Sequence, residues 1–149
     1  MTVTYDSKDL IRAFDLATRV SPTAKGGAWD KAAGMVVKID KDGHTTVLAT
    51  NIDIAVHVEL DATAIKDAPD DVVMWRMSAL FIAQFVKKLS GAITVNEDTK
   101  KNALIFRSGK SKVEVPLMDP TDYPEFHQPP GTAPVDGQNL VAMAERIMW

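Results

Sequence analysis

The chain has 149 residues, which is enough for one domain with a substantial hydrophobic core but too short for two large domains. Hydrophobic residues make up 46% and charged residues 25%, which excludes disorder, collagen and a coiled coil, and the absence of cysteine excludes disulfides and thiolate metal sites. The net charge is −3, so any role with nucleic acid depends on where the 17 basic residues lie. The polar N-terminus and the lack of a long apolar run predict a cytoplasmic protein that does not enter a membrane.

The first half of the chain predicts one helix and several strands. The helix covers residues 7–20, because Asp6 and Ser7 are good N-caps and an apolar residue recurs at helical spacing after them. The strands that follow flank a two-residue turn at Asp42-Gly43 and end in a segment of clean alternation. The predicted strands are residues 1–6, 35–39, 45–49 and 54–60, with a loop at 23–30 and a polar linker at 66–71.

The second half repeats this order. Ser78 is expected to cap a helix that runs to about Leu89. Predicted strands cover residues 72–75, 92–95, 103–106 and 112–116. Strand, helix and three strands therefore occur twice, which indicates an internal structural repeat. The predicted fold class is α+β, with two helices packed on one face of antiparallel sheets.

The C-terminal part of the sequence predicts the start of another unit. Residues 116–134 are rich in proline and are typical of an extended linker, and a short strand at 135 and a helix over 138–149 follow. We therefore expect one domain over residues 1–126, a linker over 127–134 and the truncated beginning of a second domain over 135–149. On this interpretation the chain is a fragment of a longer protein.

Both predicted helices combine an apolar face with a mainly basic outer face. In the first helix the three basic residues fall within about 40° of one another at 100° per residue, opposite the apolar side, and Asp15 interrupts them. The second helix is expected to bury Phe81, Ile82, Phe85, Val86 and Leu89. The basic positions are Lys8, Arg12, Arg19, Lys87 and Lys88. A solvated helix surface explains each face alone, whereas the two faces together could follow a phosphate backbone without reading bases.

A second basic cluster lies on the last predicted hairpin. It consists of Lys100, Lys101, Arg107, Lys110 and Lys112, with no acidic residue between them. Two interpretations stay open. Lysines on an edge strand discourage aggregation, or they mark a contact with an acidic partner.

The sequence lacks the residue patterns of an enzyme. His44, His57 and His127 have no partners at metal-binding spacing, so each is predicted to be a surface or structural histidine. The carboxylate pairs fall in predicted loops, where turn and cap roles dominate. Phosphate-binding, dinucleotide-binding and nucleophile-elbow motifs do not occur. We therefore predict no catalytic residues, no metal and no cofactor.

Several segments resemble one family in order and spacing. Residues 47–53, VLATNID, resemble a strand and turn of the bacterial sliding clamp, the β subunit of DNA polymerase III. Residues 106–112, FRSGKSK, followed by residues 119–126, DPTDYPEF, resemble the end of the first domain of that family. The two predicted helices also fall at the family's spacing. The resemblance covers essentially the whole chain, that is, the first clamp domain and the first strand and helix of the second.

The resemblance implies a DNA clamp fold and a role in replication without chemistry. In the family, two chains of three domains form a ring around duplex DNA and tether the replicative polymerase, and a clamp loader is a further partner. Helices line the ring, so Lys8, Arg12, Arg19, Lys25, Lys87 and Lys88 would face double-stranded DNA. Among these, Lys87 matches a basic position of the family and Lys25 is the nearest counterpart of a contacting arginine. Lys110 and Lys112 match the edge strand that pairs with an acidic strand of the other subunit of the homodimer.

The sequence also departs from the family pattern. Residues 27–33, GAWDKAA, replace a proline-containing segment of the family, which makes the chain a divergent member. Two other functions remain as alternatives: a stand-alone clamp-like protein that binds a clamp or a clamp loader, and a small enzyme. The family's peptide-binding pocket lies between the second and third domains, outside this chain.

Overall fold

The computed structural model describes residues 1–22, Gly26 and residues 28–125. Their helices are α1 (Ser7–Val20), α2 (Ala28–Ala32) and α3 (Ala79–Val86). Their strands are β1 (Thr2–Asp6), β2 (Met35–Ile39), β3 (His44–Thr50), β4 (Ala55–Asp61), β5 (Ala64–Lys66), β6 (Val73–Met77), β7 (Ala92–Asp98), β8 (Ala103–Ser108) and β9 (Ser111–Met118). The expected linker at 127–134, the expected start of a second domain at 135–149, His127 and Lys25 lie outside the described residues.

Helix α1 begins and ends where its sequence predicts. The Asp6 carboxylate accepts a hydrogen bond from the Lys8 backbone N–H and so caps the N-terminus. Four apolar side chains at helical spacing are buried, namely Leu10, Ala13, Phe14 and Ala17. At the other end the backbone N–H and the hydroxyl of Ser21 both donate to the Ala17 carbonyl. The buried face fixes the orientation of the helix, so its basic residues are exposed.

Helix α3 is shorter than the sequence predicts. Ser78 caps it as expected, by accepting from the Phe81 N–H, but the helix ends at Val86 instead of about Leu89. Two bonds between residues three apart, from Lys88 to Phe85 and from Leu89 to Val86, tighten its last turn. The prediction that Phe81 belongs to the buried stripe is wrong, because its side chain is 37% exposed. Its ring instead lies 4.8 Å from that of Phe85.

The nine strands form one antiparallel sheet in the order β4-β3-β2-β6-β9-β8-β7-β1-β5. Two sequence repeats are visible in it, β1-α1-β2-β3-β4 and β6-α3-β7-β8-β9, as predicted. The first strand of each repeat pairs with the other repeat: β1 pairs with β7, and β6 pairs with β2. The two halves of the domain are therefore interlocked rather than joined end to end.

The sheet folds over so that its halves face each other across a common core. The Tyr5 hydroxyl on β1 is 2.8 Å from the hydroxyl of Thr45 on β3, and both side chains are buried. This burial raises the pKa of Tyr5 to about 12. The Trp75 indole on β6 likewise donates to Glu97 on β7.

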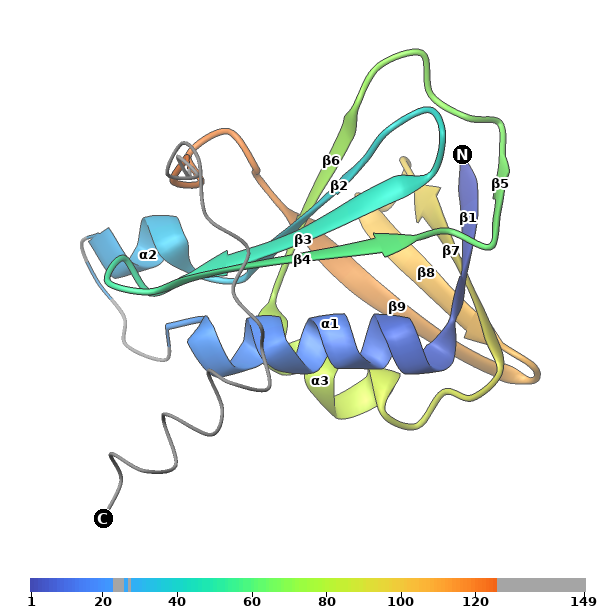
Figure 1. Ribbon diagram of the computed structural model, residues 1–149, viewed down its shortest axis with the longest axis horizontal. Helices are drawn as coiled ribbons and strands as arrows, with labels where there is room; N and C mark the ends of the chain where they lie inside the picture. The colour runs from blue at the N-terminus through green and yellow to red at the C-terminus, as the bar shows by residue number, and fades with distance from the viewer. Residues whose placement is uncertain (23–25, 27, 126–149) are drawn as a thin grey trace, which may run out of the picture.

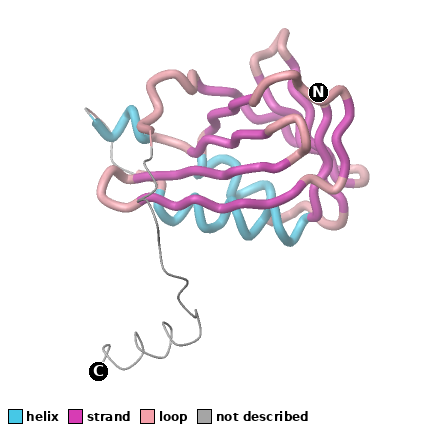
Figure 2. The backbone as a smooth tube through the Cα atoms, turned by 45° about the horizontal axis from the view of Figure 1, so that its top comes forward, coloured by secondary structure: helices cyan, strands magenta, loops and turns pink. Residues whose placement is uncertain are grey.

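Figure 1 and Figure 2 show α1 and α3 together along one side of the strands, as the sequence predicts. No helix of the described residues is long and apolar enough to span a bilayer.

Two elements were not expected from the sequence. Strand β5 is only three residues long and pairs with β1 at the end of the sheet. Helix α2 is a short helix of five residues that begins inside the loop predicted at 23–30 and ends two residues after it. Neither element is long enough to produce a periodic pattern, because a helical repeat requires more than one turn and a strand more than three residues.

Residues 30–33, just before β2, are held by hydrogen bonds from a buried side chain. The Arg76 side chain is buried and donates to the backbone carbonyls of Asp30, Lys31, Ala33 and Asp119. The guanidinium also lies 5.2 Å from the centre of the Tyr123 ring. These bonds satisfy carbonyls at the end of α2, of which that of Asp30 also accepts from the Ala33 backbone N–H. Arg76 thereby joins α2, β6 and the segment after β9.

Candidate nucleic-acid interface

The basic residues of α1 form a line along its exposed side. Lys8, Arg12 and Arg19 are all exposed, and at 1.5 Å per residue the first and last lie about 16 Å apart along the helix axis. The burial of the opposite face against the sheet explains why they point outward. This part of the predicted DNA-binding set therefore occupies one accessible surface.

The basic residues of the second helix lie just after it. Lys87 is the C-cap residue of α3, and both Lys87 and Lys88 are exposed. Because the last turn tightens after Val86, the two lysines do not continue the regular helical wheel. The Lys88 ammonium lies 5.9 Å from the centre of the Phe85 ring, whereas the Lys87 ammonium is directed to α1. The structure thus separates two residues that the sequence places together.

Asp15 connects the two helices through a three-residue ion-pair network. One of its carboxylate oxygens accepts from the Lys87 ammonium at 2.6 Å. The other accepts from the Arg19 guanidinium, from Nη2 at 2.8 Å and from Nε at 3.0 Å. The hydrogen bonds from Lys87 and then from Arg19 lower the pKa of Asp15, so it is ionised at neutral pH. The sequence shows Asp15 only as an interruption of the basic stripe.

Arg12 lies beside an acidic edge of the sheet. A groove of about 550 Å³ separates α1 from β4, and its lining includes Arg12, Asp9, Glu59 and Asp61. Strand β4 is the last strand at this end of the sheet, so one of its sides has no neighbouring strand among the described residues. Among those same residues Lys8 and Arg12 form no ion pair within 4.0 Å.

The second predicted basic site lies on the β8–β9 hairpin. Lys110 is in its turn and Lys112 is on β9, and both are exposed. Strand β9 pairs with β8 along residues 111–116, but it meets β6 only at Leu117 and Met118. Within the described residues one side of β9 is therefore open over most of its length. Glu114, which the sequence cluster did not include, lies 2.9 Å from Lys101 and 3.9 Å from Lys112.

The histidines described by the structure belong to surface strands. His44 contacts the Asp61 carboxylate, and this hydrogen bond raises the pKa of His44. His57 lies 3.5 Å from Glu59 on the same strand. The described residues contain no group of three histidine, aspartate or glutamate side chains arranged to hold a metal ion.

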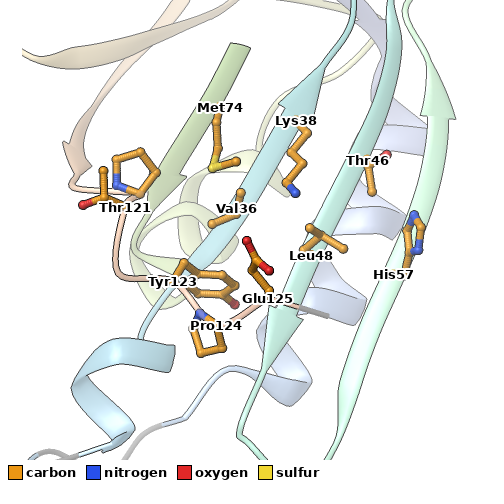
Figure 3. Close-up of a pocket in the computed structure, with 11 residues that line it drawn as sticks. Val36, Lys38, Thr46, Leu48, His57, Met74, Thr121, Tyr123, Pro124 and Glu125 are labelled. Carbon is orange, nitrogen blue, oxygen red and sulfur yellow. The ribbon is translucent and has the colours of Figure 1, made fainter. Parts of the chain in front are cut away.

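A pocket of about 660 Å³ lies over β2, β3, β4 and β6 and is bordered by the segment that follows β9. Figure 3 shows Tyr123 and Pro124 beside Val36, with Lys38 farther along β2 and His57 across the sheet on β4, beyond Leu48. Val36, Leu48 and Tyr123 form a small buried cluster there. Burial raises the pKa of Tyr123 to about 12, and its hydroxyl accepts from the Thr50 N–H. Sequence patterns miss this pocket because its residues come from separate segments.

Neither a protein-family model nor a curated protein matches the sequence. Solved structures do match. The DNA polymerase III β subunit of Thermotoga maritima is 21% identical with a TM-score of 0.78, and "pol III beta" of Caulobacter crescentus is 18% identical with a TM-score of 0.77. Each match covers 97% of this chain and 38% of the other. The β subunit of the Streptococcus pyogenes DNA polymerase is 17% identical with a TM-score of 0.73, over 91% of this chain and 35% of that one.

These likenesses establish the fold of the chain as that of one part of a bacterial sliding clamp, as the sequence resemblance implies. The chain spans little more than a third of the length of these clamps. At this level of identity the likeness concerns the fold, because unrelated functions can share a fold and function depends on the site.

Proposed function

We propose that this chain supplies the first domain and the start of the second domain of a DNA sliding clamp, a processivity factor with no catalytic activity of its own. The fold carries this proposal, since nearly the whole chain superposes on part of several bacterial clamps. In the proposed protein the chain encircles duplex DNA together with further domains and tethers the replicative polymerase. Residues 1–126 are the first domain, 127–134 the linker and 135–149 the start of the next domain. The protein acts in the cytoplasm.

The proposed DNA-binding surface consists of the outward side chains of the two helices and the loop after α1. Lysine and arginine neutralise phosphates and release counterions, which gives binding without sequence preference. Exposure of these residues on α1 and at the end of α3 supports the proposal. The proposed contacts are Lys8, Arg12, Arg19, Lys25, Lys87 and Lys88.

The proposed subunit contact is the open side of β9. An unpaired strand edge offers backbone donors and acceptors to another strand, and the positive charges of Lys110 and Lys112 favour an acidic one. A second copy of the complete protein supplies that strand and forms a homodimeric ring. The polymerase and the clamp loader bind as further protein partners.

The test of this function uses topology. The complete natural protein is incubated with nicked circular DNA, and the complexes are separated by gel filtration before and after the circle is linearised. A ring stays on the circle and slides off the free ends, so we expect retention only before cleavage. Equal loss from both forms contradicts a ring. Charge reversal at Arg12, which forms no ion pair among the described residues, serves as a comparison, since it weakens DNA binding and flattens its salt dependence.

A further inference from the structure

The network around Asp15 places a negative charge inside the surface proposed to bind DNA. Its two oxygens are both occupied by cations of that surface, one by Lys87 and one by Arg19. The Asp15 side chain is 27% exposed, against 56% for Lys87 and 73% for Arg19. The carboxylate therefore lies below its two partners, while they remain accessible from solvent.

We propose that Asp15 lowers the affinity of this surface for DNA, because its carboxylate competes with DNA phosphates for Arg19 and Lys87. This inference rests on the proposed function. A cation that stays on the Asp15 carboxylate neutralises no phosphate, so fewer contacts form and fewer counterions are released from the DNA. The Asp15 charge also repels phosphates that lie within a Debye length of about 10 Å at 0.1 M salt.

This arrangement suits a protein that moves along DNA. Strong contacts with phosphates would hold the protein at one place, whereas cations that exchange between an internal carboxylate and successive phosphates allow translation along the duplex. Lys8 and Arg12 lie on the same helix without an ion pair among the described residues. The surface thus contains both paired and unpaired cations, and Asp15 determines how many are immediately available.

The test replaces Asp15 by asparagine, which keeps the shape of the side chain and removes its charge. Binding of the complete protein to a short fluorescent duplex is measured by anisotropy at several salt concentrations and neutral pH. Asp15→Asn frees two cations, each contributing about 0.9 to the salt slope, so we expect the slope to steepen by about two. We also expect affinity to rise at least about tenfold near 0.1 M salt.

Asp9→Asn is the matched control. Asp9 is an exposed acid on the same helix without an ion pair among the described residues, so its replacement changes the net charge equally without releasing Arg19 or Lys87. Its salt slope should stay near that of the unmodified protein. In a Lys87→Gln background, Asp15→Asn should steepen the slope by only about one, since one cation remains to be released.

The outcomes separate this inference from the proposed function. Salt-dependent binding by the unmodified protein, with equal slopes for Asp15→Asn and Asp9→Asn, overturns the role of Asp15 but leaves the DNA-binding function intact. Weaker binding by Asp15→Asn also overturns it, because Asp15 would then position Lys87 for DNA rather than compete with it. No salt-dependent binding by the unmodified protein removes the proposed function itself, and this inference with it.

Discussion

Gly34 has the most restricted environment of the glycines with a positive φ that the structure describes. Its φ is +87°, and a Cβ at this position would lie 2.4 Å from the backbone oxygen of Met77. Its carbonyl accepts hydrogen bonds from the hydroxyls of Ser21 and Tyr123. Gly34 is therefore in contact with the residue that follows α1, with β6 and with the segment after β9.

We predict that Gly34→Ala strongly destabilises the domain. A left-handed backbone costs an alanine roughly 1–2 kcal/mol, and the contact with Met77 adds to it, so the free energy of unfolding should fall by at least about 2 kcal/mol. Gly91→Ala is the control, because Gly91 has φ +72° but open space around its Cβ position. It should cost only about 1 kcal/mol. Urea denaturation followed by tryptophan fluorescence measures both, and equal losses would show that the Met77 contact is unimportant.

At the scale of the element, strand β9 has different surroundings at its two ends. Its last residues are enclosed between β8 and β6, whereas its first residues have β8 on one side only. Lys112 lies in the open part, and Lys110 lies in the turn before it. The open part has room for an added strand. Its positive charges repel another basic strand, so they disfavour pairing of this edge with a second copy of itself.

Reversing the charges of Lys110 and Lys112 together should therefore weaken the proposed subunit contact without changing the fold. We expect the dissociation constant of the complete dimer to rise about tenfold or more, since like charges across an interface repel and Glu114 already lies nearby. Analytical ultracentrifugation measures this constant. Charge reversal of Lys41, an exposed lysine in the β2–β3 turn, is the matched control. A dimer that both variants leave unchanged would place the contact elsewhere.

At the scale of the whole molecule, the interlocked repeat explains how two helices come to share one surface. Because β1 belongs to the half-sheet of β7 and β6 to that of β2, each helix follows a strand that has crossed to the other half. The helices then contact each other, and Asp15 connects them through Lys87. One domain thus presents two helices to a single partner.

The proposed ring predicts the mass of the natural protein in solution. Light scattering coupled to gel filtration of the complete gene product should give twice the mass of its polypeptide. Six copies of a single-domain chain would still be compatible with a ring but not with a three-domain subunit. A monomer would contradict the ring and favour the alternative of a clamp-like protein that binds a clamp or a clamp loader.

Local sequence patterns determined the strongest elements of the fold. The limits of α1 and the Ser78 cap follow from capping residues and apolar periodicity, which act between near neighbours. The turn between β2 and β3 lies where Asp42-Gly43 predicts, but it covers residues 40–43 rather than two residues. The order of the repeats and the exposed basic faces could be predicted for the same reason. The end of α3, the exposure of Phe81 and the short elements α2 and β5 could not, because they depend on neighbours distant in the sequence.

Tertiary structure alone decided which strands pair and which charges meet. The sequence does not reveal that β1 joins β7, because both partners satisfy the same alternating pattern. It shows Lys87 and Asp15 as unrelated residues 72 positions apart, whereas the packing of α3 against α1 brings their charged atoms to 2.6 Å. The buried Arg76 is similar, since only the folded chain supplies the carbonyls that satisfy its guanidinium. Such contacts arise from the geometry of packing, which no local pattern contains.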